Sequence, residues 1–490
     1  MTLVVPHIHY LALLPILTYF GASLALLLMS ALVKTKVTIN WATGVTVAAS
    51  LATIVYSFFQ WSYIAHHGAT TTVAHAIVLD GFSVVGNVVI AVSVILSAMV
   101  AHDWAKRERI AGADFHVLAL AASAGALLMV QANDLVVIFL GLEILSIGLY
   151  VLVGFDRQRN ASSEAALKYF LLGGFASAIF IYGAALVYGA TGSTNLSSIS
   201  YFLSNNVVLR PGLLYAGGAL LLIGFAFKVA AVPFHLWSPD VYEGAPTPVT
   251  GVMASIVKVG AFAALLRVLI SALGTQLDTW RPILFVLIIL TCVVGASVAL
   301  VQRNVKRLLA YSSINQAGFM LLGVWSGTAR GVAATLFYVA TYAPVVIATF
   351  ALVTLVGAAG DELHSIDHYR GLARRQPWLG GALAVLLLSQ LGAPLTVGFY
   401  AKFIVLAAAI DAGGGALALV ALLSAAIAAF FYLRWTLWLY ADDEVEATRV
   451  DVPRQTAVVI AVGVIVAILF GLWPGPIVTW VQHATLLFLP

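Results

Sequence analysis

The sequence has very little charge for its length. Asp, Glu, Lys and Arg make up only 9% of its 490 residues. A soluble domain typically has about 25%, so this amount of charge cannot cover a soluble surface. Hydrophobic residues make up 62% of the chain, and apolar segments recur from near the N-terminus to the C-terminus. The sequence therefore predicts an all-α polytopic membrane protein embedded in the lipid bilayer.

Cysteine is almost absent as well. The single Cys292 lies inside an apolar run, which excludes a disulfide framework, a Cys-ligated zinc site and an iron–sulfur cluster within this chain. The net charge of +4 is not gathered into a basic face, so we expect no nucleic-acid partner. The stretches outside the membrane are short, so chemistry must happen within the membrane or on a partner. We expect no cofactor or metal on this chain.

About fourteen membrane spans result when the sequence is divided at its charged residues, prolines and polar breaks, because one crossing needs roughly 20 helical residues. The loops after odd-numbered spans contain about fifteen Lys and Arg. The loops after even-numbered spans contain only Arg210, Arg281 and Arg330. Cytoplasmic loops are enriched in Lys and Arg, so odd-numbered spans should end in the cytoplasm. An even number of spans then places both termini on the outer side.

Six basic residues fall within these spans. We expect Arg267 and Arg434 to extend from near helix ends toward the headgroups. The other four are Lys168, Lys228, Lys258 and Lys402. Lys258 is about ten residues into its span, hence roughly 15 Å deep at 1.5 Å per residue. Glu143 lies at a similar depth and is the one carboxylate clearly inside a span.

An ionisable group at the bilayer centre costs at least about 2.5 to 3.5 kcal/mol, so these groups need partners or water. One interpretation is that they form buried ion pairs that hold helices together. However, the deep basic residues outnumber the deep acidic one by four to one, so pairing alone cannot neutralise them. A buried lysine changes between its charged and neutral forms with small changes in its surroundings. The pattern therefore favours a proton relay.

Two of the lysine-bearing spans contain helix breakers. In the seventh span Pro233 follows Lys228 by five residues, and in the twelfth span Gly392 and Pro394 precede Lys402. Proline removes a backbone donor and clashes with the preceding turn, so both helices should be interrupted. Interrupted backbone at membrane depth is tolerated only where it is buried in protein or lines a wet cavity. For either span alone, an ordinary proline kink is an equal alternative.

The two broken helices lie five spans apart and, because five is odd, run in opposite directions. This is typical of an inverted repeat, with spans four to eight and nine to thirteen as the two five-helix units. The predicted organisation is a three-helix N-terminal segment, a first repeat, a second inverted repeat and a C-terminal helix, at residues 1–110, 111–275, 276–441 and 442–490.

His235 follows Pro233 by two residues, at the inner end of the seventh span. Its side chain titrates near neutral pH, so it is a candidate for carrying protons between the inner end of this span and the cytoplasm. A structural histidine remains an equal alternative.

Several stretches resemble the antiporter-like membrane subunits of the bacterial respiratory NADH–quinone oxidoreductase (complex I), and in particular subunit N. The matching stretches include FLGLEILSIGLYVLVGF around Glu143, GFAFKVAAVPFHLWSPDVYEGAPTPV around Lys228 and LGAPLTVGFYAKF around Lys402. The resemblance covers nearly the whole chain. Lys402, where the middle subunit of the group usually has a glutamate, favours subunit N.

The resemblance implies roles for the buried residues. Glu143 and Lys228 would form the charged pair of a first half-channel, and Lys168 would modulate that pair. Lys258 would link the two halves, and Lys402 would serve the second half-channel.

The resemblance also implies partners. It implies a proton-translocating subunit whose NADH, FMN, iron–sulfur clusters and quinone are bound by other subunits. The chain would lie in the membrane arm between K-like and M-like neighbours, in the bacterial plasma (inner) membrane.

Other functions stay open on the sequence alone. A multisubunit sodium/proton antiporter shares the same motif, but a sodium site would need several oxygen ligands at depth, and Glu143 alone is thin support. A relative of complex I with another electron donor would look the same in this chain. A purely structural spacer is the third alternative.

Overall fold

The computed structural model describes residues 8–32, 37–110, 112–442, 449–484 and 486, and it is helical almost throughout. Within these residues, twelve helices are long and apolar enough to cross a membrane. They are α1 (Tyr10–Leu32), α2 (Ile39–His67), α3 (Gly81–Arg107), α4 (Asp114–Gln131), α5 (Leu135–Val153), α6 (Asn160–Thr191), α8 (Pro211–Lys228), α10 (Thr247–Leu266), α11 (Leu277–Ala299), α13 (Ala329–Val356), α17 (Gly415–Tyr440) and α18 (Arg454–Leu472).

The remaining two expected spans are also helical. The tenth is α12 (Val305–Trp325), which carries two basic residues in its first turn. The twelfth is a pair of shorter helices, α15 (Pro377–Leu391) and α16 (Val397–Asp411). The predicted fold class, an all-α polytopic protein with about fourteen spans, is confirmed.

The two predicted broken helices are present. Helix α8 ends at Lys228, and the short helix α9 (Trp237–Gly244) begins beyond the turn that contains Pro233. Helix α15 ends at Leu391, and Gly392 follows it with a φ of 87°, a left-handed conformation that suits glycine. The spans that carry Lys228 and Lys402 are therefore each two helices joined by irregular backbone.

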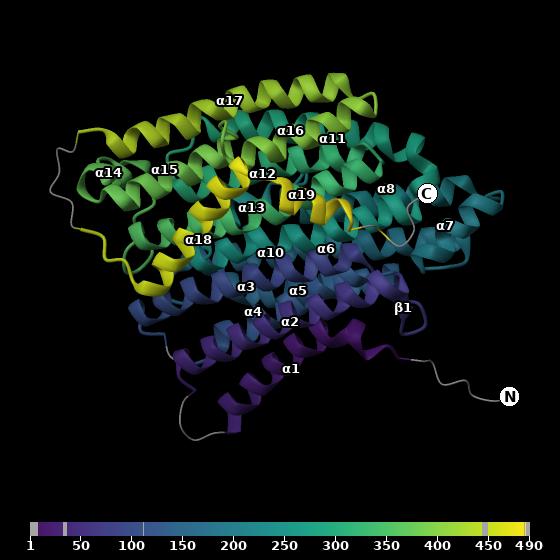
Figure 1. Ribbon diagram of the computed structural model, residues 1–490, viewed down its shortest axis with the longest axis horizontal. Helices are drawn as coiled ribbons and strands as arrows, with labels where there is room; N and C mark the ends of the chain where they lie inside the picture. The colour runs from purple at the N-terminus through teal and green to yellow at the C-terminus, as the bar shows by residue number, and fades with distance from the viewer. Residues whose placement is uncertain (1–7, 33–36, 111, 443–448, 485, 487–490) are drawn as a thin grey trace.

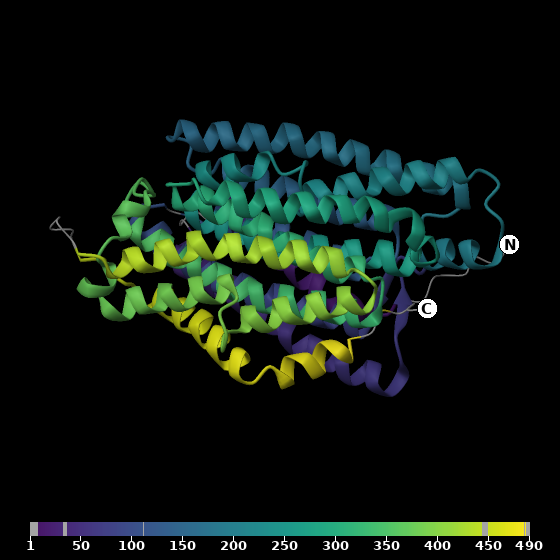
Figure 2. The same cartoon turned by 90° about the horizontal axis from the view of Figure 1, so that it is seen from above.

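Three local features differ from the sequence expectation. The expected fourteenth span divides into α18 and α19 (Gly475–Gln482), because Pro474 cannot continue the ladder of backbone hydrogen bonds. The two helices meet at an angle in Figure 2. The start of the expected third span is strand β2 (Ile77–Leu79), which pairs antiparallel with β1 (Thr70–Thr72).

The third difference is an extra helix, α7 (Leu196–Asn205), in the stretch expected to lie outside the membrane. The side chain of Asn195 accepts a hydrogen bond from the backbone N–H of Ser198 and so caps its first turn. Two short helical turns, η3 (Ile366–Tyr369) and α14 (Leu372–Arg375), fill the segment between α13 and α15.

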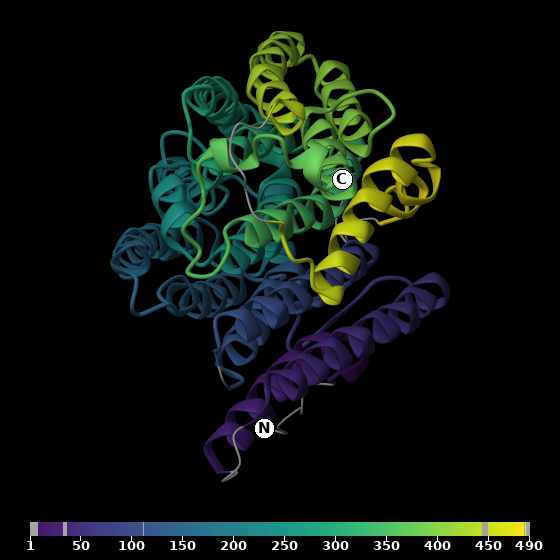
Figure 3. The same ribbon diagram turned by 90° about the vertical axis from the view of Figure 1, so that its left-hand side faces the viewer.

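The long helices run side by side along one direction (Figure 1). Helices α1 and α2 form one edge of the molecule and α17 the opposite edge, as the end-on view in Figure 3 also shows. Helices α10 and α13 lie in the interior, since nearly all residues of their most apolar parts are buried. The helix that carries Lys258 is therefore enclosed by other helices along its whole length.

Similar contacts recur in two parts of the chain at a constant offset in residue number, which we call a shared register. Asp134 caps α5 and forms an isolated β-bridge with Asn195, whereas Asn304 caps α12 and forms a bridge with Ser365. Each residue of the second bridge lies 170 positions after its counterpart, from 134 to 304 and from 195 to 365. The same spacing relates close helix contacts at Gly125 and Gly295. This shared register supports the division into two repeats, which stays a prediction.

The glycine contacts are tight because backbone meets backbone there. A Cβ on Gly125 would lie 2.5 Å from the backbone nitrogen of Leu145, and a Cβ on Gly295 would lie 2.7 Å from that of Asn315. No side-chain rearrangement relieves such a clash. The helix pairs α4–α5 and α11–α12 therefore depend on glycine at these two positions.

We expect Gly125→Val to force α4 away from α5 and to destabilise the protein by about 1 to 3 kcal/mol, the usual cost of overpacking. The check is the thermal unfolding midpoint of the purified assembly. Gly174→Val on α6 is the matched control, because nothing lies within 4 Å of a Cβ there. Equal midpoints for the two variants would contradict this account.

Candidate functional site

Lys228 lies at the end of a broken helix. It is the last residue of α8, its side chain is buried, and its Nζ donates to the hydroxyl of Ser146 at 2.6 Å. The Nζ also lies 5.4 Å from the ring centre of Tyr169 and 6.0 Å from that of Tyr150. The C-terminal end of a helix carries partial negative charge, so the position favours a cation.

Glu143 lies on α5, one helical turn before Ser146. Its Oε1 is buried, with no hydrogen-bond partner among the described residues. The ion pairs between described residues do not include one between Glu143 and Lys228. Ser146, three residues after Glu143 on the same face of the helix, is the direct partner of Lys228. The charged pair that the resemblance implies thus involves no direct contact here, and its role stays a prediction.

Lys258 lies at the centre of the bundle. Its buried Nζ donates to the backbone carbonyl of Ser313 on α12 at 2.7 Å and lies 5.9 Å from the ring centre of Tyr342 on α13. The Ser313 hydroxyl lies 3.4 Å from the hydroxyl of Tyr242 on α9. Lys258 therefore connects α10 with α12 and α13, and Ser313 in turn connects α12 with α9.

Lys402 lies on the second half of its broken span. It belongs to α16, and its buried Nζ donates to the carbonyl of Leu391, the last residue of α15, at 2.7 Å. The ammonium group lies 4.8 Å from the ring centre of Phe319. Lys228 is itself the last residue of α8, and the ammonium group of Lys402 contacts the last residue of α15. Both lysines are thus found at the C-terminal end of an interrupted helix, where the helix dipole favours positive charge.

A small cavity lined by both polar and apolar residues lies close to the second break. Its volume of about 20 Å³ is enough for one water molecule. Gln316 on α12 donates to the carbonyl of Gln390 at 2.7 Å, and Gln390 directly precedes the end of α15. The lining includes Gln316, Tyr338, Tyr342, Ser389, Gln390 and Ala401. Tyr342 faces Lys258 and Ala401 directly precedes Lys402, so a neighbour of each lysine borders the cavity.

Lys168 has a different environment from the one expected. Its side chain is 42% exposed and forms ion pairs with Glu164 at 2.7 Å and with Asp240 at 2.9 Å. Asp240, on α9, also accepts from Arg307 at 2.8 Å. The sequence grouped Lys168 among four deep lysines that pairing with Glu143 could not all neutralise, and the structure gives Lys168 two other carboxylate partners. Helix α6 begins at Asn160, so Lys168 lies near its start and within reach of α9.

His235 is buried in the turn between α8 and α9. Its ring centre lies 6.4 Å from that of Tyr311, and its Nδ1 makes no hydrogen bond to the described part of the chain. Both alternatives, proton entry and a structural role, stay predictions.

Arg267 does not reach the headgroups, which corrects the sequence expectation. Its side chain is 3% exposed and forms a two-pronged ion pair with Asp80, with N–O distances of 2.8 and 3.0 Å. Its Nε donates to the carbonyl of Val130 at 2.6 Å. By contrast, Arg434 is exposed and donates to the carbonyl of Leu300 at 2.8 Å, beside the end of α11.

Sequence reasoning missed other buried polar groups. Lys306 is fully buried in the first turn of α12 although it was counted among loop residues. Asp361, Gln316 and Gln390 were not singled out. A signal for the glutamines was present, because each is a strongly polar residue inside an expected span. Lys306 and Asp361 stand at the ends of spans, where charge is ordinary, so the sequence offers no signal for them.

Comparison with known proteins decides the family. Residues 132–428 match the family described as NADH:quinone oxidoreductase/Mrp antiporter, TM. The NADH-quinone oxidoreductase subunit N 2 of Roseiflexus castenholzii is 40% identical over 417 residues, which are 83% of this chain and 84% of that protein. The chain belongs to the subunit N family of NADH–quinone oxidoreductases. The family expected from the sequence is confirmed.

Solved structures share the fold. A chain in the respiratory complex I from Thermus thermophilus with bound Aureothin is 34% identical, with a TM-score of 0.82 covering 96% of this chain and 100% of that one. A chain of the Mrp complex from Dietzia sp. DQ12-45-1b has a TM-score of 0.85 at 20% identity and covers 97% of each chain. At that identity the Mrp likeness shows a shared fold alone.

We expect Arg267→Met to break the buried ion pair with Asp80 and to destabilise the fold by about 3 to 5 kcal/mol, the usual cost of breaking a buried pair. The thermal unfolding midpoint and the amount of folded chain in membranes measure this loss. Arg434→Met removes an exposed arginine and serves as the control, with a change within about 0.5 kcal/mol. A small effect of Arg267→Met would show that the pair contributes little.

Proposed function

We propose that this chain is a proton-translocating membrane-arm subunit of an NADH–quinone oxidoreductase, and that Lys228, Lys258 and Lys402 carry its protons. The family membership and the likeness to a Thermus thermophilus complex I chain support the first part. The second part rests on how the three buried lysines are held.

The main observation behind this proposal is that the Nζ of each of these lysines donates a hydrogen bond to a neutral oxygen. The acceptors are a serine hydroxyl, a backbone carbonyl in mid-helix and a backbone carbonyl at a helix end. None of the three forms an ion pair within the described ranges. An ammonium group and a neutral amine can both donate to such an acceptor, so the same contact holds the side chain in either charge state.

A lysine held in an ion pair cannot change its charge state while keeping the same contact. Lys168 and Lys306 contact carboxylates, and an opposite charge favours the protonated form. The three lysines with neutral acceptors are therefore the better proton carriers. Lys168 would act on Lys228 indirectly, through Asp240 on α9, the helix that follows the first break.

A mechanism follows from this arrangement. A change in charge near Glu143 would weaken or strengthen the hold of α5 on Lys228, since Ser146 on that helix is its hydrogen-bond partner. A proton released by Lys228 would reach Lys258, and the cavity beside Tyr342 would pass it on toward Lys402. Moving one charge against the membrane potential takes about 2.3 kcal/mol per 100 mV, which is within the range of such rearrangements.

The rest of the machinery would lie on partners. NADH, FMN, iron–sulfur clusters and quinone would be bound by other subunits, and the neighbours in the membrane arm would be K-like and M-like subunits. The distribution of Lys and Arg among the loops supports a location in the bacterial plasma membrane with both termini on the outer side. A cation/proton antiporter is the alternative, and its support is the family description, which names the Mrp antiporter beside NADH:quinone oxidoreductase.

The function is tested by replacing the three lysines one at a time with alanine in the assembled complex. We expect each change to lower proton pumping and coupled electron transfer by roughly a hundredfold, the lower end of what a positioned proton-transfer group contributes. Proton uptake and NADH–quinone activity are measured on the same membranes. Lys106→Ala, at an exposed position of α3, is the control. Normal pumping in all three variants would favour a structural spacer.

A second test moves Lys402 without removing it. At Gly392 the backbone has a φ of 87°, and a Cβ there would lie 2.9 Å from Cδ of Lys402. We expect Gly392→Ala to displace the ammonium from the Leu391 carbonyl and to lower pumping roughly tenfold or more. Gly413→Ala has the same backbone strain at a φ of 86° with nothing within 4 Å. Equal pumping in the two variants would show that the Lys402 contact is dispensable.

A further inference from the structure

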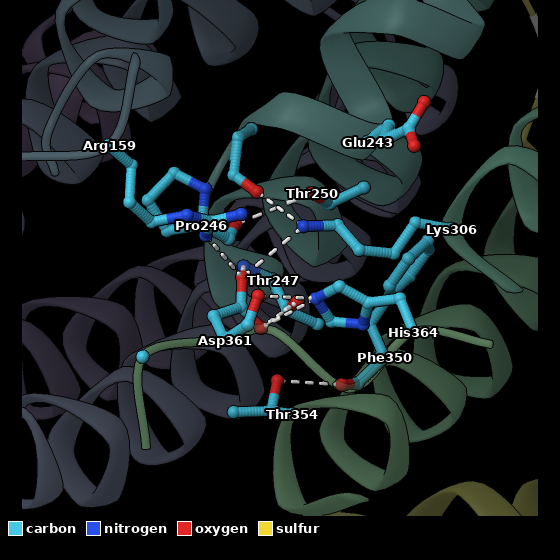
Figure 4. A network of polar contacts seen from close by, with 12 residues as sticks. Arg159, Glu243, Pro246, Thr247, Thr250, Lys306, Phe350, Thr354, Asp361 and His364 are labelled. Carbon is cyan, nitrogen blue, oxygen red and sulfur yellow. Dashed lines mark hydrogen bonds and ion pairs between the residues drawn. The ribbon is translucent and has the colours of Figure 1, made fainter. Parts of the chain in front are cut away.

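A network of buried polar groups surrounds Asp361, which lies in the turn after α13 (Figure 4). Its Oδ1 accepts from the hydroxyl of Thr247 at 2.6 Å, and its Oδ2 accepts from the backbone N–H of Thr247 at 3.0 Å. Its Oδ2 also lies 3.3 Å from Nζ of Lys306 and 3.1 Å from Nη1 of Arg159. His364 completes the network, with its Nε2 at 3.2 Å from Oδ1.

Asp361 acts as the N-terminal cap of α10. The first N–H groups of a helix have no partner within the helix. The N-cap residue of α10 is Pro246, which has no side chain able to accept a hydrogen bond. The carboxylate of Asp361 accepts the hydrogen bond of the first of these N–H groups instead. Its negative charge also lies at the positive end of the helix dipole.

The same carboxylate holds the start of α12. Lys306 lies in the first turn of α12 and is fully buried. Besides its ion pair with Asp361, it donates to the carbonyl of Ala245, just before α10, at 2.5 Å. The backbone N–H of Val305 donates to the carbonyl of His364 at 2.8 Å. The beginnings of α10 and α12 are therefore fastened to one turn of the chain.

These two helices make the contact that holds Lys258. From Thr247 to Lys258 there are about three helical turns, and from Lys306 to Ser313 about two. The Nζ of Lys258 donates to the carbonyl of Ser313 across the same helix pair. A shift of α10 along α12 would change this distance directly, because both helices are rigid over so few turns.

We propose that Asp361 is a positioning residue of the proton relay: by joining the start of α10 to the start of α12, it sets the height at which Lys258 meets Ser313. This inference rests on the proposed role of Lys258. Asp361 acts through Lys258 and touches none of the three relay lysines.

Asp361 is not itself a proton carrier. Burial alone would raise its pKa, but Lys306, His364 and Thr247 outweigh burial and hold the pKa of Asp361 well below its usual value. A carboxyl group with a lowered pKa stays ionised down to low pH. The carboxylate therefore keeps its donors over the pH range in which the relay works.

The test uses membranes that carry the assembled complex, with protons pumped per electron as the readout. We expect Asp361→Asn to lower this ratio roughly tenfold to a hundredfold, the effect of misplacing a reacting group by about 1 Å. Thr247→Val removes one donor from the network at equal size, and we expect a smaller drop in the same direction. Thr247→Val provides the test if the complex that carries Asp361→Asn fails to assemble.

Two controls match these variants. Glu362→Gln changes the exposed neighbour of Asp361. Thr354→Val changes a buried threonine in Figure 4 whose hydroxyl donates only within its own helix, to Phe350 at 2.7 Å. We expect both controls to pump normally. Loss of pumping in these controls equal to that of Asp361→Asn and Thr247→Val would overturn the proposal.

A rescue experiment separates positioning from simple helix capping. Serine is a good N-cap residue, so Pro246→Ser in the Asp361→Asn background supplies a local cap for α10 but no link to α12. We expect this double variant to regain hydrogen-exchange protection in the first turn of α10 while pumping stays low. Recovery of pumping as well would overturn the proposal, because capping alone would then be sufficient.

Lys258→Ala, measured in parallel, distinguishes the two proposals. Normal pumping in Lys258→Ala would refute the relay itself, and the role of Asp361 with it. If Lys258→Ala loses pumping while Asp361→Asn and Thr247→Val pump like the unaltered complex, the relay stands and the positioning role of Asp361 is wrong.

Discussion

Every backbone polar group at membrane depth must find its partner inside the protein, and the site depends on this constraint. An interrupted helix leaves carbonyl groups at its end without partners, and a buried lysine needs an acceptor. The two requirements satisfy each other where Lys402 donates to the last carbonyl of α15. At the other break, Lys228 ends α8 and takes a serine hydroxyl.

The charged groups divide into two populations with different tasks. Ion pairs that involve Asp361, Asp240 and Asp80 fasten the ends of helices to one another. The three relay lysines lie between these fastened ends and contact neutral oxygens. Lysines that stabilise the fold are therefore held in ion pairs near helix ends, whereas the lysines proposed to exchange protons contact neutral oxygens deeper in the bundle.

Hydropathy and proline were sufficient to predict most of the spans, the two breaks and the three buried lysines Lys228, Lys258 and Lys402, because each of these signals is local. The partners were not predictable in this way. Arg267 and Asp80 are 187 positions apart, and Thr247 and Asp361 are 114 apart. No periodicity in the sequence connects such pairs, since only the packing of helices brings them together. The break at Pro474 did have a local signal, and it was overlooked because no charged residue accompanies it.

Helix α10 is held at both of its ends by carboxylates from distant segments. Asp361 binds its first residue, and Asp80 binds Arg267, the residue that directly follows its last. These two contacts oppose a shift of α10 along its own axis. In the proposed relay, a signal from a neighbouring site would therefore reach Lys258 through electrostatic interactions and side-chain motion, without a shift of α10 along its axis.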